Sequence, residues 1–391
     1  MTTITAKPAQ QRASFDMHMV ALTAALVGFG IVAVFSASFA RAAASSIDSF
    51  YLVKRQTVAA IVGAAAMLVM ARLSMERVRE LAYGAAALAA VSLALVLVLG
   101  VAINGARRWF PVGFFHLQPS EFAKLAVVLA AARFAIDNPR RMRTLKGLMA
   151  PLGMAAGVAA LVVVEPDLGT AVVIMALAFV VCHFAGARAR HLGAYMAVGI
   201  ALVVVAIVAE PYRLKRIEAW VKPHETSLTS GYQLRHSVIA LGAGGVIGRG
   251  LGESREKYAY LPAAETDCIF AIVGEEMGLL GTWGLLALFA LLVWRGMTAS
   301  LRAADPFAAL VGAGVTSLIA LQVMMNVAVV TGMAPTKGAP LPFVSYGGSS
   351  LILAMAAVGL LLNVSRQPGR AQALPPARDH RSAEKPSRPT S

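Results

Sequence analysis

The chain has 391 residues, of which 58% are hydrophobic and only 14% are charged. Soluble domains carry about a quarter charged residues, so this composition excludes an ordinary water-soluble fold. The formal charge of +15 does not indicate nucleic-acid binding, because Lys and Arg fall in short clusters between apolar runs and not along one face. The pattern is typical of an all-α protein that crosses a membrane many times.

The first apolar run, residues 17–40, follows Lys7 and Arg12 and therefore resembles a secretory signal. A signal peptide has an apolar stretch of only about 7 to 15 residues, and here similar runs keep following. We therefore predict a retained first membrane span, preceded by a cytoplasmic tail of residues 1–16.

A helix that crosses a bilayer needs about 20 mostly apolar residues. The sequence predicts ten such helices within a polytopic membrane domain of residues 17–366. Their expected ranges are 17–40, 52–71, 81–101, 118–136, 148–164, 168–186, 192–209, 268–294, 307–331 and 345–365.

The distribution of basic residues predicts the orientation of these spans. With the N-terminus inside, tails and short loops carry twenty Lys and Arg on the inner side and six on the outer side. Positive charge in short loops marks the cytoplasmic side. We therefore expect an inner-membrane protein with both ends in the cytoplasm and one long outer loop, 210–266. Residues 367–391, rich in charge and proline, are predicted to form a disordered cytoplasmic tail.

Ionisable side chains inside membrane spans are costly and usually face an interior cavity or one another. In the fourth span, Glu121 and Lys124 lie three residues apart and share a helix face. They either line a cavity or form a local ion pair that lets the helix insert. Asp167, in the turn between the fifth and sixth spans, is either a site residue or a simple helix cap.

The eighth span combines an outer carboxylate with two deeper ones. Asp267 lies at its outer boundary, about 12 Å along a helix from Glu275. Glu275 and Glu276 are flanked by Gly274 and Gly278, a spacing that permits close helix contact. We expect Asp267 to meet an aqueous substrate while the two glutamates brace the bundle. The alternative for Asp267 is a carboxylate favoured only by the helix dipole.

The last outer loop, residues 335–350, is dense in glycine, proline and hydroxyl groups. Irregular backbone at membrane depth is tolerated where it is buried in protein or lines a watery cavity. Lys337, Ser345 and Ser349 are therefore candidate cavity residues. The glycine-rich run 242–250 lacks the surrounding elements of a nucleotide site and predicts flexible or closely packed backbone.

Signatures of several soluble enzyme classes are absent from the sequence. It contains no HExxH, no Walker A lysine, no GxSxG and no histidine spacing suited to a metal. The two cysteines, Cys182 and Cys268, are predicted near opposite membrane faces, so we interpret both as core residues.

The run from Asn326 to Ser350 resembles the signature of the SEDS family of shape, elongation, division and sporulation proteins. Further similar motifs occur in order at 107–109, 118–124, 166–170, 231–234, 260–267 and 274–276. The resemblance covers nearly the whole membrane domain. The motifs at 250–258 and 335–338 are similar to the division member more than to the elongation member. Glu265 departs from the family, which usually has His before Thr-Asp.

The resemblance implies polymerisation of lipid II by inverting glycosyl transfer on the outer face during cell division. Such a transfer needs a base on the acceptor hydroxyl and positive charge on the departing diphosphate. Asp267 is the candidate base, and the family places Lys124 near it. Candidates for binding the diphosphate are the outer basic residues Arg107, Arg108, Arg213, Arg216, Arg235 and Lys257. No metal site is predicted, although a divalent cation could share this task.

The family also implies partners: a class B penicillin-binding protein that supplies transpeptidation, and other membrane proteins of the division machinery. Two alternatives remain open, a lipid II flippase and a non-catalytic scaffold. A flippase needs a polar path that reaches the inner side, whereas the polar groups here cluster at the outer junctions. A scaffold has no use for Asp267.

Overall fold

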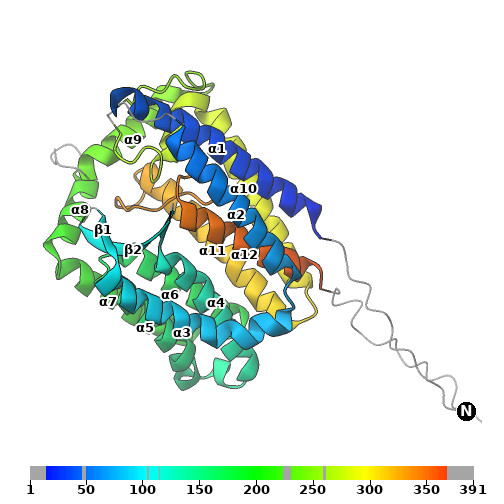
Figure 1. The fold of residues 1–391 in the computed structure, drawn as a ribbon. Helices are drawn as coiled ribbons and strands as arrows, with labels where there is room; N and C mark the ends of the chain where they lie inside the picture. The colour runs from blue at the N-terminus through cyan, green and yellow to red at the C-terminus, as the bar shows by residue number, and fades with distance from the viewer. Residues whose placement is uncertain are drawn as a thin grey trace, which may run out of the picture.

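The computed structural model describes residues 15–45, 50–103, 105–113, 115–222, 230–258 and 261–367. The two predicted tails lie almost entirely outside these residues, as do parts of the long outer loop. All ten predicted spans are helices (Figure 1). They are α1 (Met17–Ser45), α2 (Tyr51–Arg72), α3 (Met75–Leu99), α4 (Pro119–Asp137), α5 (Leu145–Val164), α6 (Leu168–Phe184), α7 (Ala189–Val208), α10 (Ile269–Arg302), α11 (Pro306–Val330) and α12 (Gly348–Ser365).

Among the described residues, eight of these helices are long and apolar enough to cross a membrane. Of the other two, α6 is apolar but has only 17 residues, and α4 carries several charges. Most side chains of α4 are buried against neighbouring helices, so protein and not lipid surrounds its charges. The prediction of an all-α membrane protein is confirmed.

The helices form two groups (Figure 1). One contains α1, α2, α10, α11 and α12, with α12 packed along α2, and the other contains α3 to α7. Helix α11 joins the groups because it contacts both α4 and α6. The segment 331–347 re-enters the protein between them, and its Phe343 ring stacks on Phe289 of α10 with centroids 6.4 Å apart.

Two connections contain structure that the sequence analysis did not predict. Between α3 and α4 lies a three-stranded antiparallel sheet of β1 (Val101–Ile103), β2 (Ala106–Val112) and β3 (Phe115–Leu117). Within the long loop lie two helices, α8 (Pro211–Val221) and α9 (Ser230–Gly244). These two helices carry four of the basic residues of the loop: Arg213, Lys215, Arg216 and Arg235.

Helix α10 is broken at Gly278, which has φ 64° and ψ −161°. This left-handed backbone favours glycine. The loop after α9 fills the break with backbone hydrogen bonds. The backbone N–H groups of Arg249 and Gly250 donate to the carbonyls of residues 275 and 276. In return, the N–H groups of residues 279 and 280 donate to the carbonyls of Gly245 and Val246. The sequence analysis did not predict this break, which is possible because a tertiary contact satisfies the backbone on both sides of it.

Candidate active site

Asp267 directly precedes α10 and faces the re-entrant segment. Its backbone carbonyl accepts a hydrogen bond of 2.9 Å from Asn326 Nδ2, and the same amide donates to the carbonyl of Ala339 at 2.6 Å. Asn326 of α11 thus ties Asp267 to the segment opposite it. A Cβ atom added to Gly338 would lie 3.0 Å from Asp267 Oδ2. Glycine at this position leaves room for the carboxylate.

The environment of Asp267 suits a general base. Burial raises the pKa of its carboxyl to about 6, although the nearby positive charges of Lys337 and Arg216 lower it. Within the described residues no hydrogen bond reaches the carboxylate. The group is therefore mostly ionised at neutral pH and has oxygens available to accept a proton.

Lys337 lies between Asp267 and Asp167. Its Nζ atom is 4.0 Å from Asp167 Oδ1, and its side chain passes over Gly169. Burial lowers the pKa of Lys337 to about 8, against the raising effect of the two aspartates. Burial also opposes ionisation of Asp167, but Lys337 and Arg108 hold its pKa below the usual value. Lys337 is thus the shared cation of two carboxylates.

Arg108 of β2 fixes the turn between α5 and α6. It donates from Nε to the carbonyl of Glu165 at 2.6 Å and from Nη2 to that of Pro166 at 2.7 Å, while Nη1 lies 3.9 Å from Asp167 Oδ2. Asp167 accepts hydrogen bonds from the backbone and hydroxyl of Thr170. The carboxylate of Asp167 is therefore a helix cap and a member of the charged cluster at once.

Glu165 is a residue that the sequence analysis did not select. Its side chain is buried, and neither carboxyl oxygen has a partner among the described residues. Burial, and then the negative charge of Asp167, raises its pKa to about 8. Glu165 therefore carries a proton at neutral pH.

Lys124 and Glu121 form a buried ion pair of 2.6 Å on α4. The family resemblance placed Lys124 near Asp267, but the described lysine that acts on Asp267 is Lys337. Lys124 lies next to Lys337, since its charge lowers the pKa of that lysine. The contact of Lys124 with Asp267 stays a prediction.

The outer arginines divide into two sets. Arg216 of α8 donates to the carbonyl of Thr336 at 3.1 Å and, with Arg108, borders the cluster around Asp267. Arg213 instead donates to the carbonyl of Ala206 at 2.7 Å. Arg107 and Arg235 are exposed on β2 and α9. Among the predicted arginines, Arg108 and Arg216 are the ones best placed to meet a diphosphate beside Asp267.

Lys257 is placed differently from our prediction. Its buried ammonium donates to Glu276 at 2.8 Å, to Ser36 of α1 at 3.1 Å and to the carbonyl of Gly252 at 2.6 Å. Three hydrogen bonds use all its donors. We therefore correct its assignment from diphosphate binding to bracing of the outer loop.

Glu275 sits at the end of the first part of α10 and is fully buried. It accepts hydrogen bonds from the Ser254 hydroxyl at 2.5 Å, from Arg249 at 3.1 Å and from the backbone of Arg255 at 3.0 Å. One residue earlier, Gly274 allows close contact with Gly244 of α9. These contacts agree with the predicted bracing role.

Ser345 holds the re-entrant segment in place. Its hydroxyl accepts from the backbone of Leu341 at 2.8 Å and donates to the carbonyl of Thr266 at 2.5 Å. Gln56 of α2, which the sequence analysis missed, donates to the carbonyl of Ser345 at 3.1 Å. Ser349 is buried in the first turn of α12. A polar residue within an otherwise apolar span was the available signal for both Gln56 and Asn326.

The described parts of the chain contain no group of three or more His, Cys, Asp or Glu arranged to hold a metal ion. The acidic residues around Asp267 are instead interleaved with Lys337, Arg108 and Arg216. The chemistry that this arrangement can supply is proton acceptance by a carboxylate and stabilisation of an anionic group by neighbouring cations.

Comparison with known proteins identifies the family. A family model described as "Cell cycle protein" and covering FtsW, RodA and SpoVE matches residues 17–369. The chain belongs to the FtsW/RodA/SpoVE family. It is 40% identical to stage V sporulation protein E of Bacillus subtilis, over 91% of this chain and 98% of that protein. It is 39% identical to the probable peptidoglycan glycosyltransferase FtsW of Geobacter metallireducens, over 90% and 94%.

Solved structures of this family have the same fold. A chain from a peptidoglycan synthase complex that coordinates polymerisation and crosslinking matches with a TM-score of 0.76 and 32% identity, over 90% of this chain and 98% of its own length. RodA of Thermus thermophilus matches with a TM-score of 0.66 and 30% identity, over 90% and 97%. The predicted resemblance to the SEDS family is confirmed, and the names of several relatives support the predicted class of enzyme, a glycosyltransferase.

Proposed function

We propose that this protein polymerises lipid II into glycan strands at the outer face of the inner membrane during cell division, with Asp267 as general base. The observation that carries this proposal is the Asp267 carboxylate, which has a raised pKa, no hydrogen-bond partner among the described residues and cations beside it. The names of the FtsW relatives support the substrate class and the role in division. The sporulation relative belongs to the same family.

In the proposed reaction, Asp267 accepts the proton of the acceptor sugar hydroxyl as its oxygen attacks the anomeric carbon of the donor. The bond from that carbon to the diphosphate breaks on the opposite side, so the configuration inverts. Arg216, Arg108 and Lys337 place positive charge around Asp267 and Asp167 and stabilise the departing diphosphate. Arginine suits this task because its planar fork binds phosphate oxygens in pairs.

The charge distribution supports the orientation. With basic short loops in the cytoplasm, both termini lie inside and Asp267 lies on the outer side. A septal location follows from the division role. The synthase complex among the structural relatives supports a partner that crosslinks the product. We propose a class B penicillin-binding protein as this partner, together with other division proteins.

Transport of lipid II is the second candidate, and the buried Glu121–Lys124 pair is what favours it. The cavity beside this pair, bordered by Gln322 and Ser350, has a volume of only about 10 Å³. That space holds about one water molecule. A sugar headgroup therefore requires a large rearrangement to pass this pair.

The decisive experiment measures glycan polymerisation from purified lipid II by this protein with its partner, whose transpeptidase is inactivated. Wild type is compared with Asp267→Asn, a nearly isosteric loss of the base. Polymer from wild type and none from a folded, partner-bound variant supports both the reaction and the base. If wild type makes no polymer where a known polymerase does, the proposed reaction is wrong; equal activity of the variant removes only the base.

A further inference from the structure

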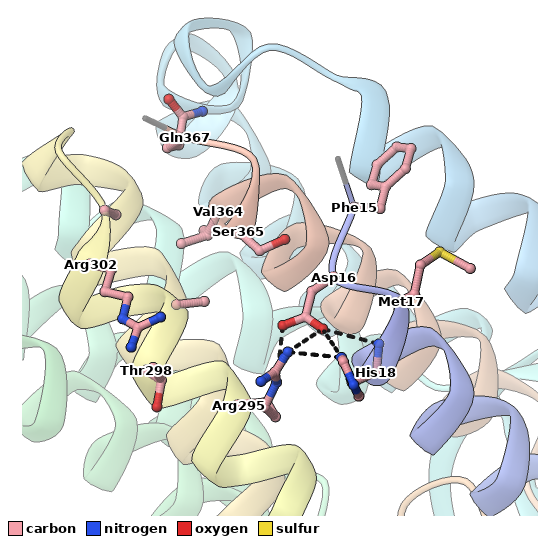
Figure 2. Close-up of a pocket in the computed structure, with 12 residues that line it drawn as sticks. Phe15, Asp16, Met17, His18, Arg295, Thr298, Arg302, Val364, Ser365 and Gln367 are labelled. Atoms are coloured by element: carbon pink, nitrogen blue, oxygen red, sulfur yellow. Dashed lines mark hydrogen bonds and ion pairs between the residues drawn. The ribbon is translucent and has the colours of Figure 1, made fainter. Parts of the chain in front are cut away.

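A second cavity lies at the end of the helix bundle where both described termini meet. It has a volume of about 460 Å³ and is bordered by the start of α1, the last turns of α10 and the end of α12 (Figure 2). A cavity of this size can hold the headgroup of a lipid or a small ligand. Nothing in the proposed polymerisation uses it.

Two arginines of α10 face this cavity. Arg295, Thr298 and Arg302 are spaced three to four residues apart and so share one face of the helix, as Figure 2 shows. Arg295 donates from Nε to Asp16 at 3.1 Å and from Nη2 at 2.8 Å, and its Nη2 also contacts His18 at 3.0 Å. Asp16 thereby neutralises one arginine and fixes its orientation.

The remaining arginine donors have no partner among the described residues. In the described part of the chain, Arg302 makes no hydrogen bond or ion pair, and neither does the Nη1 group of Arg295. The lining residues carry two arginines against one aspartate, and Arg366 lies just outside, 4.5 Å from the Phe15 ring. The described lining of the cavity is therefore positively charged.

We propose that this cavity binds the phosphodiester headgroup of an anionic phospholipid from the adjoining leaflet. Arg302 supplies a free guanidinium fork and Arg295 a second, oriented one, which together suit phosphate oxygens. Basic pockets between membrane helices on the cytoplasmic side are suited to such headgroups. With both termini in the cytoplasm, as proposed above, the adjoining leaflet is the cytoplasmic one.

The surface beside the cavity fits the rest of a lipid. Trp294 and Leu301, on the outward side of the same part of α10, are 60% and 63% exposed. Trp is favoured at the level of lipid headgroups, and exposed leucine offers apolar area to acyl chains. A free phosphate lacks these chain contacts, so lipid binds more tightly than inorganic phosphate.

The test is native mass spectrometry of the full, delipidated protein in detergent, titrated with dioleoyl phosphatidylglycerol or dioleoyl phosphatidylcholine. Wild type is compared with Arg302→Gln and with Arg190→Gln, which removes an exposed arginine at the start of α7. We expect a preference for phosphatidylglycerol that Arg302→Gln weakens by about fivefold, the effect of one cation near the membrane surface. Arg190→Gln should leave it unchanged.

Three outcomes overturn the proposal. They are equal binding of the two lipids by wild type, equal loss in the Arg302 and Arg190 variants, and displacement of phosphatidylglycerol by an equal concentration of inorganic phosphate. The last outcome would assign the cavity to a free phosphate. None of these results depends on polymerisation, so failure here and failure of the proposed function are distinguishable. Retained affinity in Arg302→Lys would show that charge, and not the guanidinium fork, carries the binding.

Discussion

Two carboxylates near the first part of α10 are treated differently by the fold. Glu275 is fully buried and accepts hydrogen bonds from side chains and backbone of the outer loop. Asp267, eight residues earlier, receives none on its carboxylate from the described residues. The cation that lowers its pKa most, Lys337, also lies 4.0 Å from Asp167. A carboxylate whose hydrogen-bonding capacity is used holds structure together, whereas one left incompletely paired is available to a substrate.

The sharpest way to break this comparison is to neutralise each carboxylate in turn. Asp267→Asn should lower the rate of polymerisation by about 10²- to 10⁴-fold, because the base is lost, with little change in melting temperature. Glu275→Gln should lower the melting temperature and retain activity per folded molecule. Polymerisation assays and thermal unfolding in the same detergent measure both. If both variants lost polymerisation rate and melting temperature to the same extent, Asp267 and Glu275 would not differ in role.

The next largest effect is a loss of stability, expected on breaking the buried ion pair of Lys257 and Glu276. Lys257→Met leaves Glu276 buried without its cation, which should cost about 3 to 5 kcal/mol of stability. Thermal or denaturant unfolding of the purified protein measures this loss. The double variant with Glu276→Gln should recover part of it, because the uncompensated charge is gone. Unaltered stability of the single variant would place Lys257 among residues free to bind substrate.

The pH dependence of the reaction tests the role of Asp267 as the base. Asp267 must be ionised to accept a proton, so kcat/KM should fall as the pH drops through about 6. Lys337 loses its charge above about 8, which gives an alkaline limb. In Lys337→Met the carboxylate loses a stabilising cation, so the acid limb should move to higher pH by about one unit. An acid limb that stays in place would separate Lys337 from Asp267.

The smallest difference is expected between two adjacent arginines. Arg108 fixes the turn that carries Asp167, whereas Arg107 is exposed on the same strand. Arg108→Gln should lower kcat/KM by about tenfold, the loss of one charge-assisted contact, and Arg107→Gln by less than about twofold. Steady-state kinetics on lipid II compare this matched pair. Equal losses would show that general positive charge, not the placement of Arg108, is what matters.

The ten spans could be predicted because each is encoded locally, as a run of about 20 apolar residues. The break at Gly278 could not, since it depends on a loop more than 25 residues earlier that docks against it. The charged cluster around Asp267 was predicted in part. Asp267, Asp167 and Lys337 stood out as polar groups at span ends, but the pairing of Lys337 with both aspartates is a tertiary contact. Lys257 was misassigned because its partner on α10 was not apparent from spacing.

The break in α10 also has a consequence for the order of biosynthesis. The residues that supply its backbone partners, 245–250, precede the break at residue 278 in the chain. They therefore leave the ribosome first and are already made when the broken helix is inserted. Unsatisfied backbone groups at membrane depth cost several kcal/mol each. A chain rearranged so that this loop followed α10 would have to insert the break before its partners existed.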